Sequence, residues 1–307
     1  MTHEQLLKNL QVPAGHIDVL LDTDTYNEID DQFAMSYMLR STEKMTVKAI
    51  CAAPFFNSNS TSPEDGMVRS YDEIKKLLRL AEREDLMDVV YEGSRGYLPD
   101  EKTPVESPAA HAIVELAQQY TTENPLYVVA IGAITNVASA LLIAPEIKEK
   151  MVLVWLGGHS QDWPNTMEFN MYQDVAGARV VFGCGVPLVQ LPCGGIVEAF
   201  AASGPELEYW LKGKNALCDY LVEHTAEAAN EYAAGKVWSR VIWDVTAVGW
   251  LLNEGDRFMQ SKIIPAAIPE YDHHYGYDYT RHPMRYIWHI NRDALMQDLF
   301  SKLGGTE

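Results

Sequence analysis

The sequence is poor in basic residues, in long apolar runs and in closely spaced cysteines. It has 24 Lys and Arg against 43 Asp and Glu, and the net charge of −19 argues against a nucleic-acid partner. No apolar run approaches the length that spans a bilayer, so we expect no membrane partner. A metal ion, or a compact neutral or cationic small molecule, suits this charge balance better.

The four cysteines are Cys51, Cys184, Cys193 and Cys218, and none lies in a C-x-x-C spacing. This argues against a zinc site and indicates free thiols in a reducing compartment. The first ten residues, MTHEQLLKNL, lack the basic and apolar regions of a signal peptide. We therefore expect a cytoplasmic protein.

Apolar strand patterns alternate with amphipathic helix patterns over the first two thirds of the 307 residues. Strands are predicted at 17–21, 45–53, 89–91, 126–131, 151–156, 187–191, 257–265 and 285–290. Helices are predicted at 29–40, 64–83, 109–120, 135–142, 175–182, 206–212, 215–234, 244–252 and 292–303. The pattern predicts an α/β fold: a mostly parallel, Rossmann-like central sheet with helices on both faces and a helical C-terminal third. No domain boundary is legible, so we expect one domain over residues 1–307.

Five acidic side chains crowd into residues 22–31: Asp22, Asp24, Glu28, Asp30 and Asp31. Their mutual repulsion is costly unless a positive charge lies among them. No Lys or Arg is close in the sequence, so hard oxygen ligands for Ca²⁺ or Mg²⁺ are indicated. Helix capping is the simpler alternative for Asp30 or Asp31, but it leaves the two acids at the strand end unexplained.

Further polar residues follow the other predicted strands. They are Asn57, Thr135, Asn136, His159, Asn165, Glu168 and Asn170. Ligands bind at the carboxyl ends of parallel strands, so these side chains should converge with the acidic cluster. Carboxylates and amides together suit a metal and a polyhydroxyl ligand.

Four segments resemble the inosine–uridine-preferring nucleoside hydrolase family. They are LDTDTYNEIDDQFAMSYML at 21–39, VVAIGAITNVASAL at 128–141, VWLGGHSQDWPNTMEFN at 154–170 and VIWDVTAVGWLL at 241–252. They stand in the family's order, and the resemblance extends from residue 17 to about residue 300.

The resemblance implies hydrolysis of the N-glycosidic bond of ribonucleosides with a bound Ca²⁺. It implies Asp24, Asp31, Asp244 and the Ile131 carbonyl as metal ligands, with Asp22 in support. The residues that it implies for the ribose hydroxyls are Asp30, Asn57, Asn165, Glu168 and Asn170. Asp24 would be the general base toward the attacking water. Similar proteins are commonly homodimers or homotetramers.

The chain departs from the family pattern at two places. The turn TYNEI, residues 25–29, is two residues longer than in familiar members and carries Glu28. Trp243 stands where purine-active members have a His that protonates the leaving base. Trp243 and Trp163 are candidates for lining the base pocket, and His159 for replacing the missing acid.

Three rival functions remain open at this stage. One is hydrolysis of a related N-riboside, such as a modified nucleoside or nicotinamide riboside. Another is a catalytically weak nucleoside- or ribose-binding protein, which the Trp at position 243 favours. An aspartyl-phosphate enzyme would share the D-x-D motif, but it would not explain Asp30–Asp31 or the Glu-Phe-Asn segment.

Overall fold

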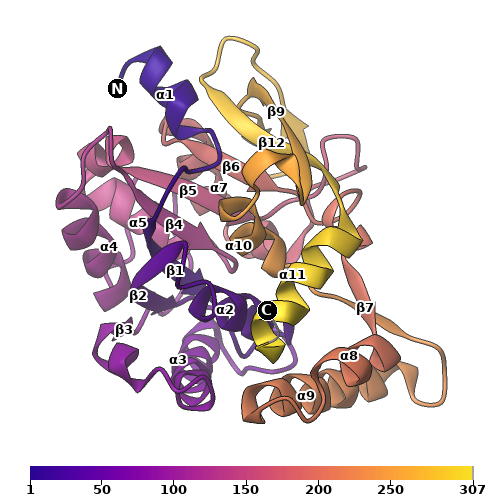
Figure 1. Ribbon diagram of the computed structural model, residues 1–307. Coiled ribbons are helices and arrows are strands. Elements are labelled where there is room, and N and C mark those ends of the chain that lie inside the picture. The colour runs from indigo at the N-terminus through magenta and orange to yellow at the C-terminus, as the bar shows by residue number, and fades with distance from the viewer. Residues whose placement is uncertain (306–307) are drawn as a thin grey trace.

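A computed structural model of the chain describes residues 1–305, and its centre is an eight-stranded sheet (Figure 1). The strand order is β3-β2-β1-β4-β5-β6-β12-β9, parallel throughout except where β9 runs antiparallel to β12. The strands are β1 (Ile17–Thr23), β2 (Met45–Ala52), β3 (Val90–Tyr91), β4 (Leu126–Ala130), β5 (Met151–Leu156), β6 (Leu188–Leu191), β9 (Met259–Pro265) and β12 (Pro283–Ile290). The first six follow the order of a doubly wound Rossmann sheet, which confirms the predicted fold class.

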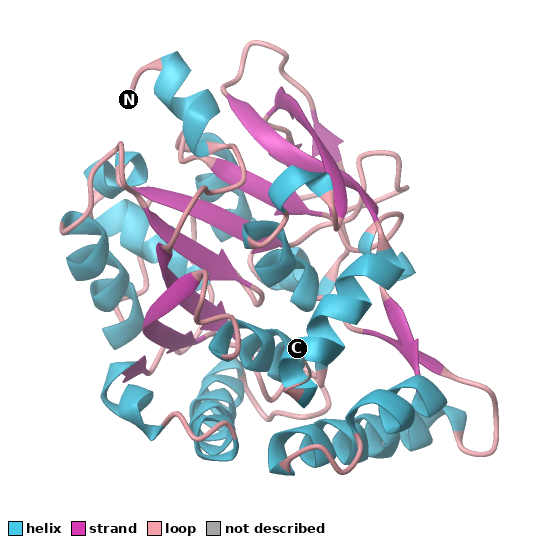
Figure 2. Cartoon of the chain, viewed as in Figure 1, coloured by secondary structure: helices cyan, strands magenta, loops and turns pink. Residues whose placement is uncertain are grey.

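Helices cover both faces of this sheet (Figure 2). The helices of residues 1–305 are α1 (His3–Asn9), α2 (Asp30–Leu39), α3 (Pro63–Leu80), α4 (Pro108–Gln118), α5 (Thr135–Ile143), α6 (Phe169–Gln173), α7 (Val175–Gly183), α8 (Gly204–Leu211), α9 (Ala216–Ala233), α10 (Val245–Leu251) and α11 (Arg292–Gly304). Successive strand residues point to opposite faces, so Leu21 joins a core with Phe33 of α2, and Leu20 joins another with Ile113 of α4. Both faces are therefore apolar, and this explains the continuous hydrophobic runs of the inner strands.

The C-terminal third contains four short strands that the sequence did not predict. β7 (Ala201–Ser203) and β8 (Ser239–Val241) pair antiparallel and form a short ribbon. Helices α8 and α9 lie between these two strands in the chain, and Figure 1 shows them beyond the end of the main sheet, with α9 in contact with α3. A second small pair, β10 (Ile268–Pro269) and β11 (Tyr275–Gly276), lies in the His- and Tyr-rich tail.

The order of the strands reverses between the neighbouring strands β1 and β4. The chain places β2 and β3 on one side of β1, and β4, β5 and β6 on the other side. Asp22 of β1 is in register with Ala130 of β4, so the residues that follow each strand emerge side by side. Such a switch point leaves an open crevice at the carboxyl ends of the strands. Within residues 1–305, no helix combines the length and the apolar character that crossing a bilayer requires.

Candidate active site

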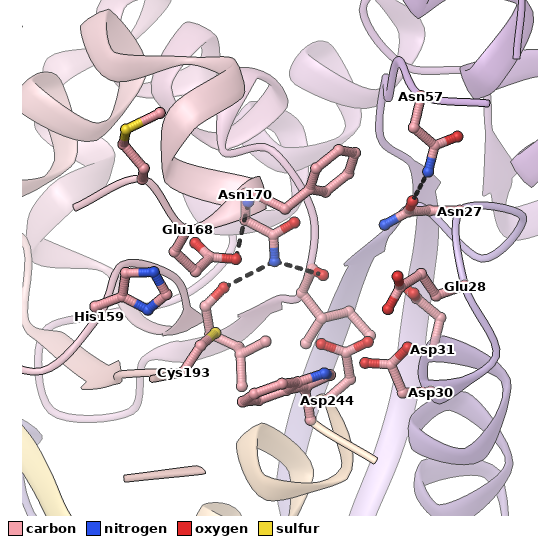
Figure 3. A pocket seen from close by; sticks show the side chains of 15 residues that line it. Asn27, Glu28, Asp30, Asp31, Asn57, His159, Glu168, Asn170, Cys193 and Asp244 are labelled. Atoms are coloured by element: carbon pink, nitrogen blue, oxygen red, sulfur yellow. Dashed lines mark hydrogen bonds between the residues drawn. The ribbon is translucent and has the colours of Figure 1, made fainter. Parts of the chain in front are cut away.

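A cavity of about 270 Å³ opens at this switch point (Figure 3). Its lining comes from the ends of β1, β2, β4 and β5 and from the loop before α10. The lining residues are Asn27, Glu28, Asp30, Asp31, Asn57, Ile131, Leu156, His159, Met167, Glu168, Phe169, Asn170, Cys193, Trp243 and Asp244. Most of the polar residues expected from the strand ends therefore do meet in one place.

Three carboxylates form the deep end of the cavity. Asp30, Asp31 and Asp244 each offer an oxygen, and these atoms lie within 4.8 Å of one another. Asp31 accepts hydrogen bonds from the Thr23 hydroxyl and, at 3.2 Å, from the backbone N–H of Asp24. Neither Asp30 nor Asp31 caps α2, because Ile29 occupies the N-cap position and no side chain caps that end. The capping explanation for this pair is thus not supported.

Burial and mutual repulsion make the ionised form of these acids costly. Burial, followed by repulsion from Asp31 and Asp30, raises the pKa of Asp24 well above its ordinary value. Burial and then Asp30 raise the pKa of Asp31 to about 8. The pKa of Asp244 is raised in the same way, by burial first and then by Asp30. A positive charge placed among these groups would offset the penalty.

The oxygens of this cluster fit a hard divalent cation. Both carboxylate oxygens of Asp24 are buried and have no hydrogen-bond partner within residues 1–305, and the same holds for one oxygen each of Asp22 and Asp30. Buried oxygens without donors are expensive unless an ion or water satisfies them. Carboxylates and a backbone carbonyl, such as that of Ile131, are the ligands that Ca²⁺ and Mg²⁺ prefer.

Asp22 and Asn136 form a buried support behind this cluster. The Asn136 amide donates to Asp22 at 2.8 Å and to the Ala52 carbonyl at 3.1 Å, and it accepts from Ser94. Burial raises the pKa of Asp22 to about 7, while the bond from Asn136 acts in the opposite direction. Asp22 does not line the cavity.

Asn170 and Glu168 lie on the opposite wall. The Asn170 amide donates to the carbonyls of Ile131 and Leu156, both at 3.1 Å (Figure 3). These two bonds use both amide protons and leave its Oδ1 as the free acceptor. Glu168 caps α6 and accepts from the backbone N–H groups of Gly158, Asn170 and Met171, so its position is set by main chain.

The lengthened turn contributes two residues to the cavity wall. Asn27 accepts a hydrogen bond from the Asn57 amide at 2.5 Å, which orients Asn57 at the cavity edge. Glu28 accepts a hydrogen bond from Arg240 of β8, and the same guanidinium lies 4.0 Å from the Asp30 carboxylate. No Lys or Arg is close to the cluster in the sequence, but folding brings Arg240 to it from a distant strand.

Four of the residues predicted for the site do not line the cavity: Asp22, Asp24, Trp163 and Asn165. Asn165 instead accepts a hydrogen bond from the Met167 N–H in its own loop. Trp163 is 40% exposed, and its ring lies 5.4 Å from that of His159. His159 and Trp243 do line the cavity.

Sequence reasoning missed five lining residues: Asn27, Leu156, Met167, Phe169 and Cys193. Three of these are adjacent to residues that it selected, and proximity in the chain was the available signal. Cys193 follows β6, and no residue after that strand was among the predicted site residues.

Comparison with known proteins places the chain in a family. The sequence profile of the inosine-uridine preferring nucleoside hydrolases matches residues 19–297. The chain belongs to this family. The predicted resemblance is thereby confirmed, and each of the four nucleoside-hydrolase segments contributes residues to the lining of the cavity described above.

Curated nucleoside hydrolases are identical to this chain at about a quarter of the aligned positions. The chain is 28% identical over 194 residues to the pyrimidine-specific ribonucleoside hydrolase RihA of Escherichia coli O1:K1 / APEC, covering 56% of this chain and 59% of that protein. RihA of Salmonella enteritidis PT4 is 28% identical over 261 residues, covering 77% of this chain and 80% of the relative. The chain thus spans only part of the length of the first of these relatives.

The fold is also that of a solved family member. The plant nucleoside hydrolase PpNRh1 superposes with a TM-score of 0.74 at 20% identity, covering 95% of this chain and 99% of that chain. At this identity the likeness concerns the fold, and the chemistry depends on the side chains of this chain itself.

Proposed function

We propose that this nucleoside hydrolase family member cleaves the N-glycosidic bond of ribonucleosides, releasing free base and ribose. One observation carries the proposal: the Asp24 carboxylate, fully buried and without donors within residues 1–305, lies next to Asp31 in the wall of an asparagine-lined cavity. Asn57 keeps one amide proton as a donor, while the Asn170 Oδ1 and the carboxylates of Asp30 and Glu168 are acceptors for sugar hydroxyls.

The proposed cofactor is Ca²⁺, held by Asp24, Asp31, Asp244 and the Ile131 carbonyl. When bound, it would gather the ribose hydroxyls with the attacking water and ease the deprotonation of that water. The carboxylates of Asp24, Asp30, Asp31 and Asp244 together carry more negative charge than one divalent ion neutralises. The surplus suits a substrate that becomes positively charged as it reacts.

The proposed chemistry assigns a distinct task to each wall of the cavity. Asp24 takes the proton of the attacking water as general base. Asp30, Asn57, Glu168 and Asn170 hold the sugar in place. The C1′–N bond then breaks through an oxocarbenium-like transition state, which the neighbouring carboxylates stabilise.

A ribose-release assay over a panel of nucleosides, with and without a chelator, tests this proposal. We expect release that the chelator abolishes, and Asp24→Ala should reduce it by at least about 10²-fold. Asp88→Ala is the matched control, because Asp88 is exposed and outside the cavity. Ribose binding without ribose release from any nucleoside would refute the enzymatic proposal.

A nucleoside- or ribose-binding protein without turnover is the second candidate function. The observation in its favour is Trp243, which lines the cavity beside Asp244 and cannot deliver a proton at neutral pH. Calorimetric titration with ribose and nucleosides, run beside the release assay, separates binding from catalysis.

We also propose a cytoplasmic homodimer or homotetramer. Support for the compartment comes from the four cysteines, all of which are free thiols. Support for a single domain over residues 1–307 comes from the one large sheet and the cores on its two faces. Light scattering of the purified chain measures the assembly directly.

A further inference from the structure

A second cavity, of about 400 Å³, adjoins the first and shares Asn27, Glu28 and Asn57 with it. Glu28 lines both cavities, and its partner Arg240 lines the second. The ion pair between them therefore forms part of the boundary between the two spaces.

One face of α9 supplies much of the second cavity. Tyr220, His224, Glu227 and Glu231 line it at helical spacing, and Tyr232 follows. Tyr26, Gln32 and Glu73 line it from the body of the protein. The cavity is thus walled by aromatic rings and carboxylates.

The charge of this cavity is only partly neutralised. Glu73 accepts from the Tyr220 hydroxyl and lies 3.6 Å from the Lys76 ammonium. Glu227 and Glu231, in contrast, have no ion-pair partner within 4.0 Å in the part of the chain that the structure describes. Two uncompensated carboxylates beside tyrosine rings form an environment that attracts a cation.

Gln32 gives a second, independent indication of a ligand. This side chain lines the second cavity and is 5% exposed. Its Oε1 is buried and accepts no hydrogen bond from any residue between 1 and 305. Buried acceptors without donors are rare in folded proteins, so a donor from outside the chain is indicated.

The two nitrogen rings that line the first cavity, the His159 imidazole and the Trp243 indole, are poor acids for a departing base. His159 is the one imidazole among its lining residues, and its Nδ1 accepts from the Gly194 N–H at 3.0 Å. Burial lowers the pKa of His159, so the neutral ring predominates at neutral pH. The Trp243 indole does not ionise in this range. A neutral base, which leaves as an anion unless it is protonated, therefore receives no proton from either ring.

We propose that the second cavity receives the leaving group and selects N-ribosides whose base already carries a positive charge, such as a pyridinium or an N-alkylated purine. This inference rests on the hydrolase function proposed above. Glu227 and Glu231 attract the cationic ring, and the tyrosine faces contact it by cation–π interaction.

The reaction balances without a leaving-group acid. When the C1′–N bond breaks, its electron pair returns to the ring nitrogen and cancels the positive charge of the base. The base then departs neutral. The water oxygen forms the new bond to C1′, and Asp24 takes the proton that the water loses.

The test compares kcat/KM for matched pairs of ribosides on the full chain supplied with Ca²⁺. The pairs are 7-methylguanosine with guanosine, and nicotinamide riboside with uridine. We expect the cationic member to be favoured at least about tenfold. The double variant Glu227→Gln/Glu231→Gln should lower that preference by about 2- to 10-fold, which corresponds to two exposed charges. Its activity on the neutral members should stay within about twofold.

Glu223→Gln is the matched control, because Glu223 lies on α9 but outside the cavity. Equal hydrolysis of cationic and neutral ribosides, or a preference that the double variant leaves unchanged, would overturn the inference and leave the hydrolase function standing. No ribose release from any of the four would overturn the hydrolase function itself.

Discussion

Arg240 and Glu28 form an ion pair between positions 212 residues apart in the sequence. Glu28 lies in the lengthened turn after β1, whereas Arg240 lies on β8, at the far end of the α8–α9 segment. The pair ties this segment to the edge of the candidate active site and puts a guanidinium 4.0 Å from Asp30.

Arg240→Met should lower the free energy of unfolding by about 1–2 kcal/mol, because it leaves Glu28 and Asp30 without their positive neighbour. The double variant with Glu28→Gln should lose less than the sum of the two single variants. Urea unfolding of all four forms measures this coupling, and strictly additive losses would show that the pair does not stabilise the fold.

Addition of Ca²⁺ to chelator-treated protein should raise the melting temperature. Binding to the folded state alone stabilises by about 2.7 kcal/mol when the free ion is at 100 times its Kd. Asp31→Asn should remove most of this gain, since it takes a charged oxygen from the cluster. Differential scanning calorimetry is the measurement. An unchanged melting temperature for the parent protein would exclude a cation site of useful affinity.

Gly132→Ala should impair catalysis more than folding. A Cβ at this position would lie 3.0 Å from the Asp24 carboxyl and 3.1 Å from the Ala53 Cβ, so the carboxyl must shift. We expect kcat to fall at least about tenfold, because small displacements of a catalytic group are costly. Gly96→Ala is the control, as a Cβ there meets nothing within 4 Å. Equal kinetics for the two variants would contradict this placement of Asp24.

Asn136→Ala should destabilise the protein by about 2–3 kcal/mol or more. The substitution removes the amide that Asp22, Ser94 and Ala52 share, and it leaves buried polar groups without partners. Thermal unfolding compares it with Asn124→Ala, whose side chain is exposed. A loss no larger than that of this control would mean that the supporting network contributes little.

Much of the fold was predictable from the sequence. Strand and helix periodicity depends on which residues face a core, and this is a local property of the chain. The predicted inner strands therefore lie within a residue or two of β1, β2, β4, β5 and β6. The ribbon of β7 and β8 was missed because strands of three residues carry too short a pattern.

The candidate site, too, was only partly predictable from the sequence. The acidic character of residues 22–31 and the polar strand ends were legible because a buried strand that ends in carboxylates is anomalous by itself. Their partners were not legible, since hydrogen bonds and ion pairs form between segments that only folding brings together. Asn136 behind Asp22, the Asn170 amide on two carbonyls, and Arg240 beside Glu28 are all contacts of this kind.

By itself, then, the sequence determined the alternation of strands and helices, the crowding of acids after the first strand, and the family resemblance that the profile match confirms. The tertiary structure alone decided that Asp30 joins Asp31 and Asp244, that Arg240 offsets part of their charge, and that a second, aromatic and acidic cavity adjoins the first. The physical reason is the distance along the chain over which each effect acts. Periodicity acts over neighbouring residues, whereas the charge and shape of a cavity depend on every segment that reaches it.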